Sequence, residues 1–382
     1  MIRLQELLPG VDIPAGLGPT QATGLTADSR AVKPGYVFFA IPGVRMDGLA
    51  FASAAVAAGA IAVVAARQPE TPLGAPCIVV ADPRAALSIA AARFYPRQPE
   101  MIVAITGTSG KTSTAAFVRQ IWARLGYQAA ALGTTGVIKP SGDIYGSLTT
   151  PDPVALHATL DALASEGITH LAMEASSHGL DQRRLDGVRL SAGAFTNLSR
   201  DHLDYHPTLD DYLAAKLRLF DTLLAPGQTA VIDADSAVAA QVIACCRARG
   251  LRVFTTGAKG ANLRIASLRA EAAATHIEVE HAGGTTLLRL PLAGDFMASN
   301  ALVAAGLCIA TGSDPAAVLA ALEHLTGAPG RLEQVGERNG APVFVDYAHK
   351  PDALEKVLRA LRPTTPGRLI VVFGCGGDRD AG

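Results

Sequence analysis

The sequence predicts an α/β protein with a largely parallel, doubly wound sheet, and three observations support this fold class. Short apolar segments typical of buried strands alternate with Ala-rich segments typical of helices. The strands follow one another at spacings that leave room for a crossover helix. One apolar strand also runs directly into a glycine-containing loop that opens a helix, which is the order found in phosphate-binding sheets.

The chain of 382 residues is long enough for two or three domains. Its α/β pattern breaks at residues 93–100, which contain two prolines and several charges, and again at residues 326–330. We therefore expect domains at residues 1–97, 98–330 and 331–382. The third has one expected helix and two expected strands, which is too little for an independent parallel sheet, so we expect the chain to be cut within that domain.

The individual elements follow from local patterns. The uncharged stretch 48–66 is long enough for a membrane span, but it is mostly Ala and Gly, which favours a soluble helix and then a strand. Strands are expected at 37–41, 60–65, 77–80, 102–106, 170–173, 192–196, 230–232, 343–346 and 369–373. Helices are expected at 50–58, 113–124, 154–165, 210–224, 298–311 and 351–361, and residues 253–290 are rich in β-branched and alternating residues.

Composition and charge exclude several classes of protein. The chain is 49% hydrophobic and 18% charged with a net charge of -1, so it lies in the globular range, and nothing indicates a nucleic-acid partner or an anionic membrane surface. Its five cysteines include no CxxC pair, which is typical of reduced thiols. The N-terminus lacks the pattern of a signal peptide. We therefore expect a cytoplasmic protein without membrane insertion.

The expected phosphate loop is Gly107-Thr108-Ser109-Gly110-Lys111-Thr112-Ser113. Its glycines allow a tight turn in which successive N–H groups and the positive helix end face phosphate oxygens. Lys111 would neutralise phosphate charge, and the Thr112 hydroxyl would bind Mg²⁺. Ile105 stands where the usual pattern has its first Gly, so the loop is a shortened variant. The alternative is a simple strand-to-helix turn with an exposed lysine, but the strand, loop and helix context favours ATP phosphates.

Acidic and imidazole groups follow the next strands of the sheet. Glu174 ends the strand at 170–173, and His202 follows the strand at 192–196. Because working residues lie at the carboxyl ends of parallel strands, these two could complete a magnesium shell with Thr112. Taken singly, Glu174 could equally be a surface carboxylate and His202 a loop histidine.

Lys216 lies on the expected helix 210–224, beside the apolar stripe Leu213, Leu217, Phe220 and Leu224. Helical geometry alone favours a lysine that packs its stem on the stripe and extends its ammonium to solvent.

Four strings together resemble the Mur ligases. They are Ile105-Thr-Gly-Thr-Ser-Gly-Lys-Thr112, Met173-Glu-Ala-Ser-Ser-His-Gly179, Phe195-Thr-Asn-Leu-Ser-Arg-Asp-His-Leu-Asp-Tyr-His206 and Val345-Asp-Tyr-Ala-His-Lys-Pro-Asp-Ala-Leu354. The resemblance runs from residue 26 to residue 380. It implies three domains: a small α/β N-terminal domain that binds UDP-MurNAc, a central parallel-sheet ATPase domain, and the start of a Rossmann-like, amino-acid-binding C-terminal domain.

The resemblance also implies a reaction. A Mur ligase of the tripeptide-forming type joins meso-diaminopimelate or L-lysine to the D-Glu γ-carboxylate of UDP-MurNAc-L-Ala-D-Glu in peptidoglycan synthesis, with ATP and Mg²⁺. The carboxylate takes the γ-phosphate of ATP, and the amine then displaces phosphate from the acyl phosphate. The motif that distinguishes the two amino acids lies beyond Gly382 in this family, which leaves the choice between them open.

Family roles carry over to matching positions. UDP-MurNAc-dipeptide contacts would come from Ala27, Ser29, Val44, Arg45, Met46, Thr149, Thr150, Ser176, Gln182 and Arg184, although Val44-Arg-Met46 replaces the more usual His-Gln-Ala. ATP contacts outside the loop would come from Asn300, Arg331, Asp346 and His349. Arg379 would meet the incoming amino acid. Lys216 would be carbamylated, which turns a cation into an anion that can bind a second Mg²⁺.

Three alternatives remain at this stage. A folylpolyglutamate-synthetase-like ligase would share the phosphate loop, but it is not expected to have Asp28-Ser-Arg30 or Ser176-Ser-His-Gly179. A Mur ligase acting one step later would share Asp28-Ser-Arg30, but the string after Val345 favours the tripeptide-forming type. The chain could also be a nucleotide-binding fragment without turnover.

Overall fold

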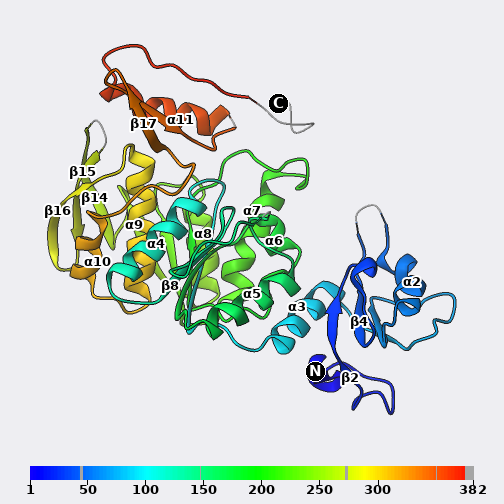
Figure 1. Ribbon diagram of the computed structural model, residues 1–382. Helices are drawn as coiled ribbons and strands as arrows, with labels where there is room; N and C mark the ends of the chain where they lie inside the picture. Colours follow the sequence, from blue (N-terminus) through cyan, green and yellow to red (C-terminus); the bar gives the residue numbers. More distant parts are fainter. Residues whose placement is uncertain (44–45, 147, 272–273, 350, 375–382) are drawn as a thin grey trace. The chain divides into compact units, whose positions relative to one another are not determined.

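We describe a computed structural model of the chain, which covers all residues except 44–45, 147, 272–273, 350 and 375–382. It contains two compact units, whose strands and helices are drawn in Figure 1. The first consists of residues 1–99, 151–167 and 181–189, and the second of residues 100–150, 168–180 and 190–382. The expected division into domains at 1–97, 98–330 and 331–382 stays a prediction.

The first unit contains a four-stranded parallel sheet in the order β3 (Gly24–Thr26), β4 (Tyr36–Ala40), β5 (Ala62–Ala65) and β6 (Cys77–Val79). The three strands expected from the sequence in this part are therefore confirmed, and a short strand precedes them. Residues 48–57 form a 3₁₀ turn (Gly48–Phe51) and helix α2 (Ala52–Ala57). None of the described helices is long and apolar enough to span a bilayer.

Two longer helices complete the first unit, and both begin at an aspartate. Asp82 caps α3 (Pro83–Phe94) and Asp152 caps α5 (Pro153–Ser165), each accepting two backbone N–H bonds ahead of a proline in the first turn. The α3 helix also packs against the returning segment 181–189, where the Ser88 hydroxyl donates to the carbonyl of Arg183 at 2.6 Å. Small elements β1 (Ile2–Arg3), α1 (Leu4–Leu7) and β2 (Gln21–Ala22) lie at the start of the chain.

The second unit is built on a ten-stranded sheet in the order β16-β15-β14-β13-β12-β11-β7-β10-β8-β9. Neighbouring strands from β8 to β14 run parallel, and the hairpin strands at both edges run antiparallel. The bounds are β7 Met101–Thr106, β8 Ala129–Gly133, β9 Gly136–Ile138, β10 His170–Glu174, β11 Ala192–Phe195, β12 Thr229–Asp233, β13 Arg252–Gly257, β14 Leu263–Glu271, β15 Ala274–His281 and β16 Gly284–Leu290. The largely parallel sheet expected from the sequence is confirmed.

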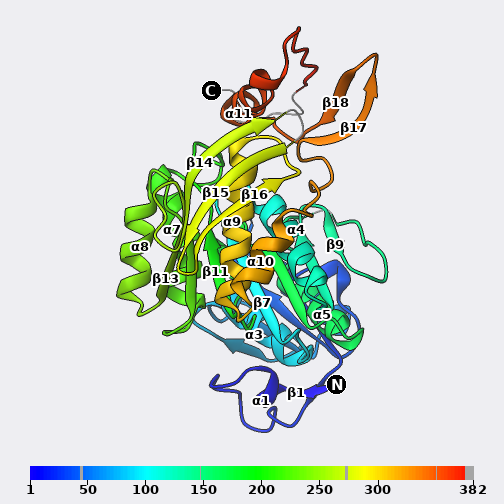
Figure 2. The same ribbon diagram turned by 90° about the vertical axis from the view of Figure 1, so that its left-hand side faces the viewer.

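Helices cover this sheet, and α4 (Lys111–Arg124), α9 (Asp295–Ala310) and α10 (Pro315–Leu322) share one large apolar core with its strands. Figure 2 shows α4, α9 and α10 together, with α7 (Leu209–Arg218) and α8 (Ala239–Ala248) farther along the sheet. The short α6 (Ser177–Asp181) follows β10. The helix expected at 210–224 ends earlier than expected, because Leu219–Leu223 widens into a π-helical turn.

The last described segment contains a hairpin of β17 (Glu333–Arg338) and β18 (Ala341–Val345), then α11 (Pro351–Leu361). The strand expected at 343–346 is found, but the strand expected at 369–373 is wrong, because that segment forms no ladder with another described strand. Apolar sequence alone does not make a strand without a neighbour to accept its hydrogen bonds. Val372 is accordingly 95% exposed.

Candidate active site

The phosphate loop lies between β7 and α4, where the sequence predicts it. Gly107 has φ +142° and Gly110 has φ +87°, both in the region that favours glycine. A Cβ at Gly107 would lie 1.9 Å from the Thr196 hydroxyl oxygen, and one at Gly110 would lie 2.3 Å from Oδ1 of Asn300. Both glycines are therefore required by backbone conformation and by close neighbours.

Only part of the loop's backbone is oriented as the sequence suggests. The N–H of Thr108 donates to the carbonyl of Asn197 at 2.9 Å, and the N–H of Ser109 donates to Asn197 Oδ1 at 2.9 Å. The expectation that successive N–H groups of the loop face phosphate is thus corrected for these two. The Lys111 ammonium bonds to the carbonyls of Gly107 and Thr108, each at 2.9 Å, and can exchange these neutral acceptors for phosphate oxygens.

Thr112 and Glu174 line one pocket of about 240 Å³. Small side chains at Ala115, Ala131 and Gly133 leave this space open, and the loop at 326–329 forms another wall. Glu174 is 1% exposed, and its carboxylate accepts bonds from the Thr134 N–H at 2.8 Å and hydroxyl at 3.3 Å. Two of the four residues expected at the metal therefore line the same pocket.

A chain of hydroxyl groups continues from Glu174. Thr134 and Thr149 share a hydrogen bond of 2.9 Å, and the Thr150 hydroxyl donates to the Glu174 carbonyl at 3.0 Å. Thr150 also accepts from the N–H and the hydroxyl of Ser176, each at 3.1 Å. The structure thus brings Thr149, Thr150 and Ser176, three residues expected at the muramoyl dipeptide, next to Glu174.

Lys216 does not extend to solvent as helical geometry alone suggests. It is 1% exposed, its ammonium donates to the carbonyl of Gly107 at 2.8 Å, and it lies 4.2 Å from the centroid of the Tyr212 ring. The helix places it beneath the phosphate loop, where a carbonyl and an aromatic face stabilise the charge. Lys216 and Lys111 thus share Gly107 as acceptor.

His202 has φ +54°, and its Nε2 lies 3.2 Å from the carboxylate of Asp201. Its ring centroid is 4.9 Å from that of His178 and 6.0 Å from that of Tyr212. His202 therefore belongs to an imidazole and phenol cluster, whereas Thr112 and Glu174 line the pocket. Within the part of the chain that the structure describes, no three His, Cys, Asp or Glu side chains are grouped to hold a metal.

Two residues expected at ATP lie against the phosphate loop. Asn300, on α9, is 6% exposed, with its side-chain amide directly beside Gly110. Arg331 donates to the Thr112 hydroxyl at 3.1 Å, and its guanidinium lies 4.5 Å from the centroid of the Tyr347 ring. Arg331 thus brings a positive charge to the first turn of α4, where phosphates would lie.

Asp346 and His349 are held within the last segment. The Asp346 carboxylate accepts from the N–H of Leu332 at 2.6 Å and of Ala348 at 2.7 Å. The His349 Nδ1 lies 2.9 Å from the carbonyl of Tyr347, and its side chain is exposed. Asp346 therefore shapes the segment that carries Arg331, and no described contact links His349 to the loop.

In the first unit, residues 28–31 form a tight turn that begins at Asp28. Its carboxylate accepts from the N–H and the guanidinium of Arg30, which lowers the pKa of Asp28 to about 2. Ala27 precedes this turn and Ser29 begins its 3₁₀ helix, while Met46 is 59% exposed. Val44, Arg45 and Arg379 lie outside the described residues.

Gln182 and Arg184 also belong to the first unit. The Arg184 guanidinium donates to the Gln182 side chain at 2.7 Å and 3.2 Å. This bond orients the guanidinium, whose planar fork suits carboxylate recognition.

Family models match three consecutive parts of the chain. The Mur ligase family catalytic domain matches residues 21–95, the Mur ligase middle domain matches 105–308, and the Mur ligase glutamate ligase domain matches 330–382. The chain belongs to the Mur ligase family. The three-domain α/β fold expected from the four strings is therefore confirmed.

Two relatives of this Mur ligase carry the name UDP-N-acetylmuramoyl-L-alanyl-D-glutamate–2,6-diaminopimelate ligase. The protein from Bradyrhizobium diazoefficiens is 59% identical over 100% of this chain and 79% of its own length, and that from Mesorhizobium japonicum is 58% identical over 95% and 75%. A solved structure of a ligase with the same name has a TM-score of 0.84 at 32% identity, covering 99% of this chain and 78% of that one.

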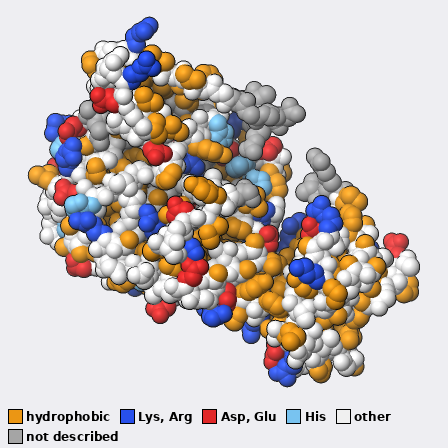
Figure 3. Space-filling view, in the orientation of Figure 1, with side chains coloured by type: hydrophobic (Ala, Val, Ile, Leu, Met, Phe, Trp, Pro, Cys, Tyr) orange, Lys and Arg blue, Asp and Glu red, His pale blue; other side chains and the backbone are white. Residues whose placement is uncertain are grey.

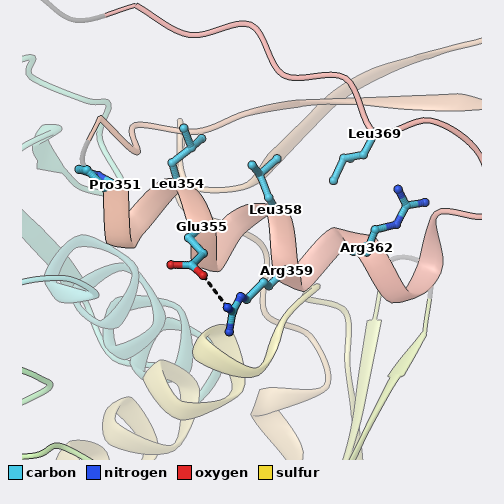
Figure 4. A pocket seen from close by; sticks show the side chains of 7 residues that line it. All are labelled: Pro351, Leu354, Glu355, Leu358, Arg359, Arg362 and Leu369. Carbon is cyan, nitrogen blue, oxygen red and sulfur yellow. Dashed lines mark ion pairs between the residues drawn. The ribbon is translucent and has the colours of Figure 1, made fainter.

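A second, apolar depression of the Mur ligase is lined by residues of the last described segment. It has a volume of about 420 Å³ and lies along α11. Figure 4 shows Leu354 and Leu358 on the side of the helix toward Leu369, and the ion pair of Glu355 with Arg359 on the other side. On the face drawn in Figure 3, acidic and basic side chains are interspersed, in agreement with the near-neutral charge.

Sequence reasoning missed three residues of the site: Thr134, Asn197 and Tyr212. Thr134 and Asn197 follow the ends of β8 and β11, so the strand-end rule that found Glu174 and His202 could have found them. Tyr212 gave no such signal, because an aromatic residue on an amphipathic helix is usually part of the core.

Proposed function

We propose that the chain is an ATP-dependent ligase that joins meso-diaminopimelate to the D-Glu γ-carboxylate of UDP-MurNAc-L-Ala-D-Glu in the cytoplasm. The observation that carries the proposal is the phosphate loop with Lys111, next to a pocket lined by Thr112 and Glu174. The names of the relatives reported above favour diaminopimelate over lysine.

The chemistry requires activation, because a carboxylate is a poor electrophile. Transfer of the γ-phosphate of ATP to the carboxylate gives an acyl phosphate and ADP. The incoming amine then attacks the acyl carbon, and inorganic phosphate leaves as the amide forms. Two anions must meet in the first step, so positive charge at the phosphates lowers its barrier. Lys111 and Arg331 are suited to supply that charge, because they lie at the loop and at the Thr112 hydroxyl.

The residues at the pocket fit Mg²⁺. The Thr112 hydroxyl and the Glu174 carboxylate are hard oxygen donors, and Mg²⁺ usually takes one or two protein oxygens with phosphates and waters. When bound, Mg²⁺ would neutralise charge on the phosphates. His202 and a carbamylated Lys216 remain our candidates for further ligands. In the described contacts His202 Nε2 lies at the Asp201 carboxylate and Lys216 Nζ donates to the Gly107 carbonyl. The other ring nitrogen of His202 and the carbamate oxygens of a modified Lys216 are the atoms that would bind the metal.

We further propose that residues 1–97, 98–330 and 331–382 are the UDP-MurNAc-binding, ATP-binding and amino-acid-binding domains. The turn around Asp28 would present Ala27 and Ser29 to the uridine nucleotide. The hydroxyl groups of Thr149, Thr150 and Ser176 would bind the dipeptide near Glu174, which supports an acceptor carboxylate close to the pocket.

The test is phosphate release with ATP, Mg²⁺, UDP-MurNAc-L-Ala-D-Glu and either diaminopimelate or lysine. We expect release with diaminopimelate, and loss of release in Lys111→Ala with uridine-nucleotide binding nearly unchanged. Lys259→Ala is the matched control, because Lys259 is exposed in the turn after β13, three positions along the sheet from β7. Release that requires folate and glutamate instead, or nucleotide binding without any turnover, would contradict the proposal.

A further inference from the structure

Three consecutive residues of the phosphate loop are held by groups from the segment that follows β11. The Gly107 carbonyl accepts from Lys216, the Thr108 hydroxyl accepts from Tyr212 at 3.2 Å, and Ser109 bonds to Asn197. The conformation of the shortened loop is therefore stabilised by these bonds as well as by its own turn. Its first half is bound to neighbouring protein groups.

Asn197 binds the loop in the way that a paired strand would. Its Oδ1 accepts from the Ser109 N–H at 2.9 Å, its Nδ2 donates to the Ser109 carbonyl at 3.2 Å, and its own carbonyl accepts from the Thr108 N–H at 2.9 Å. A side-chain amide has the donor and acceptor of a peptide group, so it can satisfy both backbone groups of one residue. Asn197 thus contacts three successive peptide groups, from Gly107–Thr108 to Ser109–Gly110.

Tyr212 connects α7 to the same loop. Its side chain is 0% exposed, and its hydroxyl donates to Thr108, whose oxygen also accepts from the Ser199 N–H at 3.0 Å. Burial raises the pKa of the Tyr212 phenol, so it stays a neutral donor. The face of the same ring lies against the Lys216 ammonium. One side chain therefore contacts both the phosphate loop and the lysine beneath it.

We propose that Asn197 and Tyr212 are positioning residues that hold Thr108 and Ser109 in the shape in which the phosphate loop receives ATP. The proposal rests on the proposed ATP-dependent function and deepens it. The N–H groups of Thr108 and Ser109 donate to Asn197, so they do not point at phosphate. Phosphate would therefore be bound by the N–H groups in the first turn of α4 and by the Lys111 ammonium. A fixed loop binds phosphate without first losing conformational entropy, so loosening it weakens nucleotide affinity.

The experiment measures equilibrium binding of a fluorescent ATP analogue to the full chain, so that turnover is not needed. Tyr212→Phe and Asn197→Ala should each weaken binding about 5- to 10-fold, as expected for the loss of one or two hydrogen bonds that order the loop. Two controls should bind like the wild type. Tyr127→Phe changes a 40% exposed tyrosine, and Asn262→Ala removes an amide that accepts from the Thr255 N–H at 2.8 Å.

A double-mutant cycle separates positioning from general destabilisation. Thr108→Val removes the acceptor of the Tyr212 hydroxyl. If Tyr212 acts through Thr108, adding Tyr212→Phe to Thr108→Val should cause no further loss of affinity. An equal loss in both backgrounds would overturn the role assigned to Tyr212.

Melting temperatures of all variants show whether they fold. Tyr212→Phe keeps the buried ring and is expected to fold. This variant and the double-mutant cycle with Thr108→Val therefore test the positioning role even if Asn197→Ala unfolds. Wild-type binding by both variants would overturn the inference and leave the proposed function intact. Failure of the wild type itself to bind the analogue would instead remove the proposed function.

Discussion

Lys216 illustrates how a single buried charge can depend on the phosphate loop. A lysine that is 1% exposed needs partners, and the described contacts supply the Gly107 carbonyl and the Tyr212 ring. Lys111 bonds to the same carbonyl at 2.9 Å, so two ammonium groups converge on one oxygen. Carbamylation of Lys216 would remove one of these positive charges and place an anion near the loop, which would favour a cation there.

We predict that Lys216→Ala lowers ligation by about 10- to 100-fold, the scale expected when a group that supports a metal site is removed. Short-chain carboxylic acids should restore part of the activity, because they can occupy the space and supply the carboxylate that a carbamate would provide. Phosphate release with and without acetate measures both effects. Full activity of Lys216→Ala, or equal stimulation of the wild type by acetate, would contradict the role.

Among the elements, α5 carries a buried histidine that makes stability depend on pH. His157 is 0% exposed, its Nε2 lies 3.3 Å from the Asp186 carbonyl, and burial lowers its pKa to about 4. The unfolded chain, with a histidine pKa of about 6.5, binds more protons between these values, so unfolding is favoured as the pH falls. The contribution is complete above about pH 6.5 and is lost as the pH approaches 4.

We therefore predict that the first unit loses on the order of 3 kcal/mol of stability between pH 7 and pH 4 through His157, and that His157→Phe flattens this part of the pH profile. Urea unfolding at several pH values, followed by hydrogen exchange in α3 and α5, measures the slope. His324→Gln is the matched control, because His324 is exposed at the end of α10. An unchanged slope in His157→Phe would exclude His157 as the cause.

Some strands can be predicted from the sequence and others cannot. The strand Met101–Thr106 and its neighbours are continuous buried apolar runs, which only a doubly covered parallel sheet accommodates, so their pattern predicts them. In contrast, β17 (Glu333–Arg338) is mostly exposed and polar, and it exists because β18 pairs with it. The apolar residues 369–373 show the converse, since they lack a partner strand among the described residues.

For the candidate site, the sequence predicts residues whose chemistry is tied to a local motif, such as Lys111, Thr112 and Glu174. It does not predict partners that depend on three-dimensional packing. The burial of Lys216 under Gly107 and the bond from Tyr212 to Thr108 span more than 100 positions of sequence. The local periodicity of the sequence cannot predict contacts between residues that lie so far apart in the chain.

At the scale of the whole molecule, the chain leaves its first unit after residue 99 and returns to it twice, at 151–167 and 181–189. Gln98 connects the first passage to the last return. It is 8% exposed, its Nε2 donates to the Gly187 carbonyl at 3.0 Å, and its Oε1 accepts from the Arg189 N–H at 2.9 Å. The stability of the first unit therefore depends on segments that lie far apart in sequence, whereas the ten-stranded sheet has its own core.

We predict that Gln98→Ala destabilises the first unit by about 1–3 kcal/mol, because it leaves the Gly187 carbonyl and the Arg189 N–H without their partner. Hydrogen exchange should accelerate in α3 and in β3 to β6, while β7, β10 and β11 of the second unit keep their protection. Gln68→Ala is the control, since Gln68 is exposed and makes only a long bond of 3.4 Å to the Cys77 carbonyl. Equal acceleration in both units would mean that they unfold as one, which would contradict their independent cores.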